Sequence, residues 1–176
     1  RGPAVICLDL SGSMAGAKGI WAKAVALVLA DLARRDGRTA TVITFSSGAA
    51  SVRRHDIVPD RRGHTRKPLD RPALLGFAQT PVGGGTDFVA PLWKAREVIE
   101  NSRKHRRADI VLVTDGEAHV SPEQLEEFSG FKAETDTRCL GVLVDVAGHE
   151  RGTVDALCEE VVSVKALKVG EVRGIA

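Results

Sequence analysis

Short apolar segments alternate with segments of helical periodicity along almost the whole chain, and this alternation most constrains the fold. Residues 4–8 and 110–114 form nearly continuous apolar runs, as expected of strands that are covered on both faces of a parallel sheet. Strand-like and helix-like segments follow one another from residue 4 onwards. We therefore predict a doubly wound, Rossmann-like α/β fold with a mostly parallel sheet of about six strands and helices on both faces.

The predicted elements follow from apolar periodicity and turn residues. Strands are expected at residues 4–8, 39–46, 51–58, 109–114, 139–146 and 161–167, and helices at 17–35, 72–79, 88–102, 121–133 and 153–159. The link at residues 47–48 is too short for a crossover, so one antiparallel edge strand is expected. No repeat or linker divides the chain, and we interpret residues 1–176 as a single domain excised from a longer protein, because a strand follows Arg1 almost at once.

Two helices carry more specific signals. In residues 17–35 the apolar set Trp21, Ala24, Val25, Val28 and Leu32 recurs at three- and four-residue steps. That spacing predicts a helix with one apolar face toward the core. At the start of the helix 121–133, the sequence Ser-Pro-Glu-Gln predicts an N-cap, a first-turn proline and a capping box.

Oxygen-bearing side chains stand where predicted strands end. Asp9, Ser11 and Ser13 follow the first strand at alternate positions, which project from one side of an extended chain. Thr86 follows three glycines ahead of a helix, and Asp115 follows the run 110–114. Hard oxygen ligands of this kind suit Mg²⁺ or Mn²⁺ rather than a soft metal, so the set predicts a divalent-metal site, with Ca²⁺ as the less expected ion.

In their order, these five residues resemble the metal-ion-dependent adhesion site of von Willebrand factor type A domains. The resemblance covers essentially the whole chain. It implies that Ser11 and Ser13 bind the metal directly, and that Thr86 is a metal ligand whose contact changes between the free and the partner-bound state. It also implies that Asp9 and Asp115 act largely through water, and that a partner's Asp or Glu carboxylate fills an open position.

Each part of the set also has a plainer interpretation. The residues after the first strand could form a turn rich in local hydrogen bonds. Thr86 or Asp87 could simply cap the following helix, and Asp115-Gly116 is an ordinary turn signal. The plainer interpretation must account for all five residues in the family's order, which favours the metal site.

The resemblance extends to a class of binding proteins. Residues 2–14, together with Gly84 to Asp87, look like bacterial proteins that work beside MoxR-type AAA+ ATPases. We therefore expect a non-catalytic, cytoplasmic, Mg²⁺-dependent interaction module with an AAA+ ATPase as partner. Two alternatives remain open, an extracellular adhesion domain and a divalent-metal-dependent hydrolase. No nucleophile elbow or phosphate loop supports an enzyme.

Charge and composition exclude some other classes. The net charge is +2, and no run of about 18 apolar residues predicts a membrane span. The basic cluster at residues 61–71 contains no Tyr, Trp or Phe that could stack on bases, which disfavours nucleic-acid binding. The basic cluster at residues 103–107 is expected to end a helix, where cations complement the helix dipole. The three cysteines form no metal-binding motif and are interpreted as free, apolar core residues of a protein in a reducing compartment.

Overall fold

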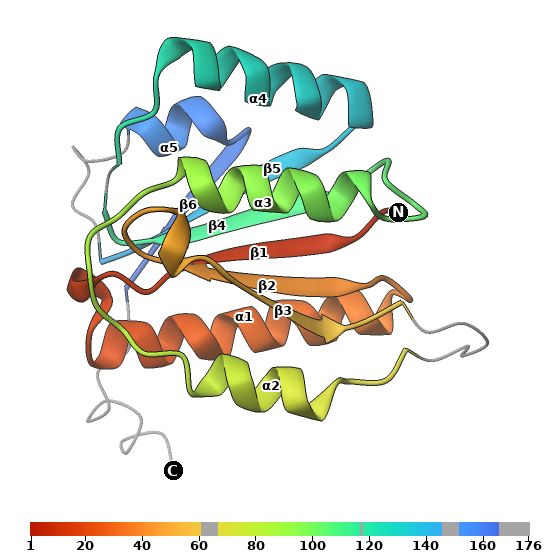
Figure 1. The fold of residues 1–176 in the computed structure, drawn as a ribbon, viewed down its shortest axis with the longest axis horizontal. Coiled ribbons are helices and arrows are strands. Elements are labelled where there is room, and N and C mark those ends of the chain that lie inside the picture. The colour runs from red at the N-terminus through yellow and green to blue at the C-terminus, as the bar shows by residue number, and fades with distance from the viewer. Residues whose placement is uncertain (61–66, 117, 146–151, 166–176) are drawn as a thin grey trace.

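The computed structural model describes residues 1–60, 67–116, 118–145 and 152–165, and it confirms the predicted α/β fold (Figure 1). One six-stranded sheet runs through it in the order β3-β2-β1-β4-β5-β6. The strands are β1 (Ala4–Asp9), β2 (Ala40–Phe45), β3 (Arg53–Val58), β4 (Asp109–Thr114), β5 (Arg138–Val144) and β6 (Glu160–Val164). All neighbouring strands are parallel except β3, which pairs antiparallel with β2 at one edge as expected. Residue 146 and residues 166–167, the ends of two predicted strands, lie outside the described residues.

The helices lie on both faces of the sheet. They are α1 (Ala17–Arg35), α2 (Arg71–Ala78), α3 (Val89–Glu100), α4 (Pro122–Thr135) and α5 (Gly152–Leu157), with short 3-10 turns at Gly12–Met14 and Ala49–Ser51. Figure 1 shows α1 and α2 on one face and α3, α4 and α5 on the other. At the start of α4, Ser121 and Gln124 form the predicted capping box. In the part of the chain that the structure describes, no helix is long and apolar enough to cross a membrane.

Each face of the sheet has its own hydrophobic core, because the inner strands are apolar throughout. Every residue of β1, β2 and β4 is buried. Phe88, Phe128 and Leu157 belong to the core between the sheet and α3, α4 and α5. Met14 and Phe77 belong to the core between the sheet and α1 and α2. This double covering explains why these strands read as continuous apolar runs.

Helix α1 spans the predicted residues, but the prediction of its buried side was wrong. It packs on the sheet through small side chains, which are Gly19, Ala22, Ala26, Ala30 and Ala33. Val28 and Leu32 from the predicted apolar face are 59% and 52% exposed, and Ile20 is 67% exposed. The helix is apolar on nearly all sides, so periodicity alone fits two faces, and the close contact with the sheet selects the smaller side chains.

The strand order fixes where a ligand can bind. From β1 the chain passes through α1 to β2 on one side of β1, and β4 pairs with the other side of β1. In open α/β sheets this reversal leaves a crevice outside the carboxyl ends of the two strands. The residues that follow β1 and β4 therefore meet at the one place in the sheet that is best suited to a ligand.

Candidate metal centre at the carboxyl edge of the sheet

Asp9 is the last residue of β1, and its carboxylate is fully buried. One oxygen accepts a hydrogen bond from the Ser11 amide at 2.8 Å, and the other accepts one from the Thr114 hydroxyl at 2.6 Å. Burial raises the pKa of Asp9 above its ordinary value, the hydrogen bonds from Thr114 and Ser11 lower it, and the nearby negative charge of Asp115 raises it again. The carboxylate is thus held rigidly in a place where a positive charge would stabilise it.

The two predicted serines connect Asp9 to Asp115. The Ser11 and Ser13 hydroxyl oxygens lie 3.0 Å apart, and the Ser13 hydroxyl donates to Asp115 Oδ1 at 2.7 Å. Asp115 directly follows β4, which pairs in parallel with β1. Residues more than a hundred positions apart therefore form one continuous hydrogen-bonded set at this edge.

Thr86 reaches the same edge from the glycine-rich loop. This loop is joined to the segment after β1 by two backbone hydrogen bonds, from Gly12 N to Gly84 O at 2.9 Å and from Gly83 N to Leu10 O at 2.8 Å. Gly84 has a φ of 93°, a conformation that side chains disfavour. The Thr86 hydroxyl lies 3.9 Å from the position that a Cβ on Gly116 would occupy, beside the turn that carries Asp115.

The structure distinguishes the roles of Thr86 and Asp87 at the start of α3. Asp87 Oδ1 accepts a hydrogen bond from the Val89 amide at 2.9 Å, so Asp87 satisfies a backbone donor of the first turn. Thr86 is partly exposed, and its hydroxyl makes no hydrogen bond with any residue that the structure describes. The N-cap of α3 is Phe88, so neither Thr86 nor Asp87 holds the N-cap position considered from the sequence. Asp87 bonds the first-turn amide from one position earlier, and the Thr86 hydroxyl is left available to a ligand.

Two residues of the site escaped sequence reasoning. Thr114 is completely buried at the end of β4 and donates to Asp9. Lys18, in the first turn of α1, forms an ion pair with Asp115 Oδ2 at 2.6 Å. A hydroxyl that ends an otherwise apolar strand was a visible signal for Thr114. The contact of Lys18 with Asp115 depends on how α1 lies against the sheet, and no local sequence pattern reports that.

The oxygens of the site lie at hydrogen-bond distance from one another. The Ser11–Ser13 and Ser13–Asp115 oxygen pairs are 3.0 Å and 2.7 Å apart, which is the ordinary length of an O–H···O hydrogen bond and selects no ion size. Hydroxyl and carboxylate oxygens are hard donors, which suit a hard divalent cation. Over residues 1–60, 67–116, 118–145 and 152–165, no group of three His, Cys, Asp or Glu side chains could hold a metal. Any metal at this edge would therefore depend on hydroxyl ligands.

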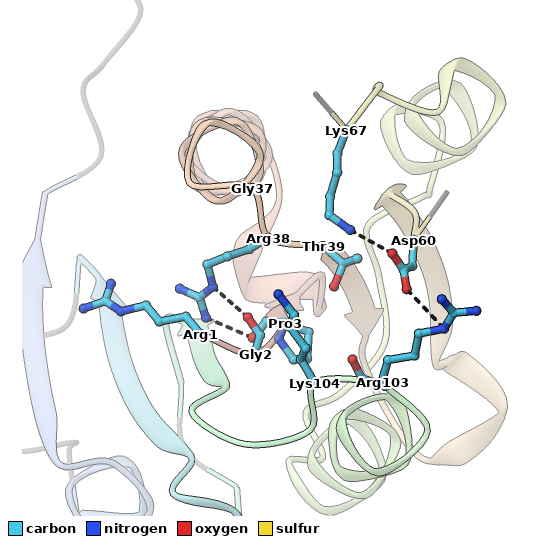
Figure 2. Close-up of a pocket in the computed structure, with 11 residues that line it drawn as sticks. Arg1, Gly2, Pro3, Gly37, Arg38, Thr39, Asp60, Lys67, Arg103 and Lys104 are labelled. Carbon is cyan, nitrogen blue, oxygen red and sulfur yellow. Dashed lines mark hydrogen bonds and ion pairs between the residues drawn. The ribbon is translucent and has the colours of Figure 1, made fainter. Parts of the chain in front are cut away.

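Residues of the two basic clusters meet near the amino ends of β1 and β2, at the opposite end of these strands from the candidate metal centre. Figure 2 shows Lys67 and Arg103 on either side of Asp60, at nitrogen–oxygen distances of 2.9 Å and 3.8 Å. They line a cavity of about 220 Å³ that also includes Arg38, which donates to the Gly2 and Pro3 carbonyls. Residues 61–66, the rest of the first cluster, lie outside the described residues. The described members of both clusters therefore lie far from the candidate metal centre.

Comparison with known proteins agrees with this arrangement. Residues 4–117, which include all five candidate ligands, match the profile of the von Willebrand factor type A domain. The chain belongs to this family. Because the matched segment extends from β1 past β4, it contains both strands whose carboxyl ends carry the site. The type A domain thus accounts for the sheet order, the helices on both faces and the position of the hydroxyl-rich segment after β1.

The relatives with similar sequences are larger proteins. Two uncharacterized proteins of the archaeon Methanocaldococcus jannaschii are 36% and 34% identical over 175 and 172 residues, or 99% and 96% of this chain. This chain spans only 37% and 40% of their lengths. A protein of Proteus mirabilis named regulatory protein ViaA is 32% identical over 71% of this chain and 23% of its own length.

Solved structures share the fold at lower identity. A von Willebrand factor type A protein from Catenulispora acidiphila superposes with a TM-score of 0.66 at 20% identity, covering 99% of this chain and 41% of that one. Proximal thread matrix protein 1 of the mussel byssus, described with a zinc-occupied metal-ion-dependent adhesion site, gives 0.61 at 17% identity, covering 94% and 44%. These likenesses establish the fold of the type A domain.

Proposed function

We propose that this type A domain is a non-catalytic protein-interaction module that binds Mg²⁺, or Mn²⁺, at its carboxyl edge. The observation that carries the proposal is the hydrogen-bonded chain from Asp9 through Ser11 and Ser13 to Asp115. The zinc described at the corresponding motif of the mussel protein supports a divalent ion at such a motif in this fold.

Each of the five residues has a role in this proposal. Ser11 and Ser13 would hold the cation directly, and Thr86 would join them from the glycine-rich loop. Asp9 and Asp115 would balance its charge, largely through water, and orient the serines. With few anionic ligands in contact, the cation keeps much of its charge and can attract a further carboxylate.

The partner is proposed to supply that carboxylate from an Asp or Glu side chain. The first candidate is a MoxR-type AAA+ ATPase inside the cell, in an assembly like those of the bacterial proteins that residues 2–14 resemble. The relative named as a regulatory protein in Proteus mirabilis supports a regulatory setting. Because this chain spans about two-fifths of its archaeal relatives, the role of the whole protein is part of the proposal.

Metal binding is tested first, by calorimetric titration of the domain with Mg²⁺, Mn²⁺ and Ca²⁺. Asp9→Ala and the double variant Ser11→Ala/Ser13→Ala should lose metal binding while their circular dichroism spectra remain those of a folded domain. A matched double variant, Ser102→Ala/Ser129→Ala, makes the same chemical change away from the site and should bind normally. Equal metal affinity in the wild type and the Ser11→Ala/Ser13→Ala variant would show that the metal does not bind at this site.

Partner binding is tested separately, in an interaction assay with the candidate AAA+ ATPase in Mg²⁺ and in EDTA. Binding should require the cation and be lost in Thr86→Ala. It should also be lost when one particular acidic residue of the partner becomes Gln, because an amide is a poorer ligand for a hard cation. Association that is indifferent to EDTA and to Thr86→Ala would show that another face of the domain holds the partner.

A further inference from the structure

Lys18 places a positive charge inside the candidate metal centre. Its ammonium nitrogen lies 2.6 Å from Asp115 Oδ2, while Asp115 Oδ1 accepts the hydrogen bond from Ser13. The Asp115 side chain is only 1% exposed, and that of Lys18 is 30% exposed. Both oxygens of this carboxylate are therefore engaged, and one of them neutralises a lysine that solvent can still reach.

The position of Lys18 does not favour its own helix. Lys18 is the second residue of α1, which has no acidic residue in its first turn. A cation at this end is opposed by the helix dipole, which favours negative charge at the N-terminus. Among the described residues, Asp115 is the acidic partner of Lys18. The lysine therefore stabilises the Asp115 carboxylate of the site and does not stabilise the N-terminus of its own helix.

The charges of the site make the consequence clear. Asp9 and Asp115 bring two carboxylates to the site, and the ammonium group of Lys18 pairs with one of them. A divalent cation that approaches Asp115 meets a carboxylate that already has a counter-ion, and it is repelled by that counter-ion. The pair therefore stabilises the site without metal and weakens its attraction for metal.

The geometry points to a competition: Lys18 and the hydrated divalent cation are both held by the Asp115 carboxylate, so metal binding releases Lys18 from Asp115. This inference rests on the proposed metal site and deepens it, because it makes Lys18 the residue that sets the metal affinity. Once released, the ammonium group faces solvent, to which the Lys18 side chain is already 30% exposed.

The first test measures Mg²⁺ and Mn²⁺ affinity in Lys18→Met by calorimetry. Removing the competitor should raise the affinity roughly tenfold or more. Arg35→Met is the matched control, since it removes one cation from the exposed end of the same helix, about 25 Å away at 1.5 Å per residue. At physiological salt that separation exceeds the Debye length of about 8 Å, so its affinity should stay near that of the wild type.

The second test needs no variant at the site. Lysine labelling by reductive methylation, followed by peptide mass spectrometry, should show that Mg²⁺ increases the labelling rate of Lys18. Lys94 is the internal control, because its side chain is 33% exposed and is also paired with a carboxylate, that of Glu97. Its labelling rate should not respond to the metal.

The outcomes separate the two ideas. Metal affinity that falls or stays unchanged in Lys18→Met, while Asp9→Ala abolishes binding, overturns the competition and leaves the metal site standing. A Lys18 labelling rate that does not respond to saturating Mg²⁺ also overturns it. If Asp9→Ala and the double serine variant bind metal like the wild type, the metal site itself fails, whatever Lys18→Met does.

Discussion

Replacing Thr114 by valine removes one hydroxyl and nearly preserves the shape of the side chain. In the wild-type domain this hydroxyl donates to Asp9 Oδ2 at 2.6 Å, and both residues are completely buried. The variant leaves a buried carboxylate oxygen without its donor. Hydrogen bonds to charged groups contribute about 1.5–3 kcal/mol, so the free energy of unfolding at pH 7 should fall by about 2 kcal/mol.

Thermal unfolding in EDTA provides the assay. For a domain of this size, about 2 kcal/mol corresponds to a decrease in Tm of roughly 4–8 °C. Thr44→Val is the matched control at the end of β2. Thr44 is 1% exposed, and among the described residues its hydroxyl contacts only His55, at 3.3 Å, a neutral partner when the histidine is deprotonated. That variant should lose less than about 1 kcal/mol.

The pH dependence gives a second check. Burial raises the pKa of folded Asp9 above its ordinary value, so the stability linked to this group is fully present below the unfolded pKa and is lost as the pH rises through the folded pKa. Without Thr114 as donor the folded pKa should rise further. The difference between Thr114→Val and the wild type should therefore be largest at neutral pH and shrink in acid. A deficit equal to that of Thr44→Val at pH 7 would refute the reasoning.

Three further predictions concern the packing. Ala26→Leu, on the buried side of α1, should cost about 1–3 kcal/mol of unfolding free energy, whereas Val28→Lys on the exposed side should stay within about 0.5 kcal/mol in the same denaturant titration. Gly141→Ala should cost about 1–3 kcal/mol, because its Cβ would lie 2.7 Å from Val154 Cγ1, and adding Val154→Ala should recover part of that loss in a double-mutant cycle. The hydrogen bond with the Cys158 thiol, at 3.4 Å, and burial raise the pKa of Cys139 well above its usual value. Thiol reagents should therefore modify Cys139 only after unfolding, and rapid labelling of Cys139 in the native domain would contradict this.

The fold was predictable because its strongest signals are local. Continuous apolar runs are typical of a sheet covered on both faces, and the connection between β2 and β3, residues 46–52, is too short for a crossover, which leaves an antiparallel neighbour. The buried side of α1 was not predictable in the same way. Its apolar residues fit two helical faces equally well, and the choice depends on how closely the helix approaches the sheet, which is a property of the assembled core.

The candidate site shows the same division. Asp9 and Asp115 could be expected to meet because both end parallel strands and such ends share one edge. The partners that hold them, Thr114 and Lys18, depend on strand register and helix placement, which the linear sequence does not encode locally. The identity of the metal and the extent of the domain within a longer protein stay predictions.

Helix α1 exposes several of its large hydrophobic side chains to water, and this has a consequence for the energetics of any larger assembly. Full burial of an Ile, Val or Leu side chain contributes about 1.5–3 kcal/mol, and Ile20, Val28 and Leu32 are each more than half exposed. Together they represent several kcal/mol, which is comparable to the net stability of a typical domain. A surface that covers them gains this free energy and, by mass action, raises the temperature at which the domain unfolds.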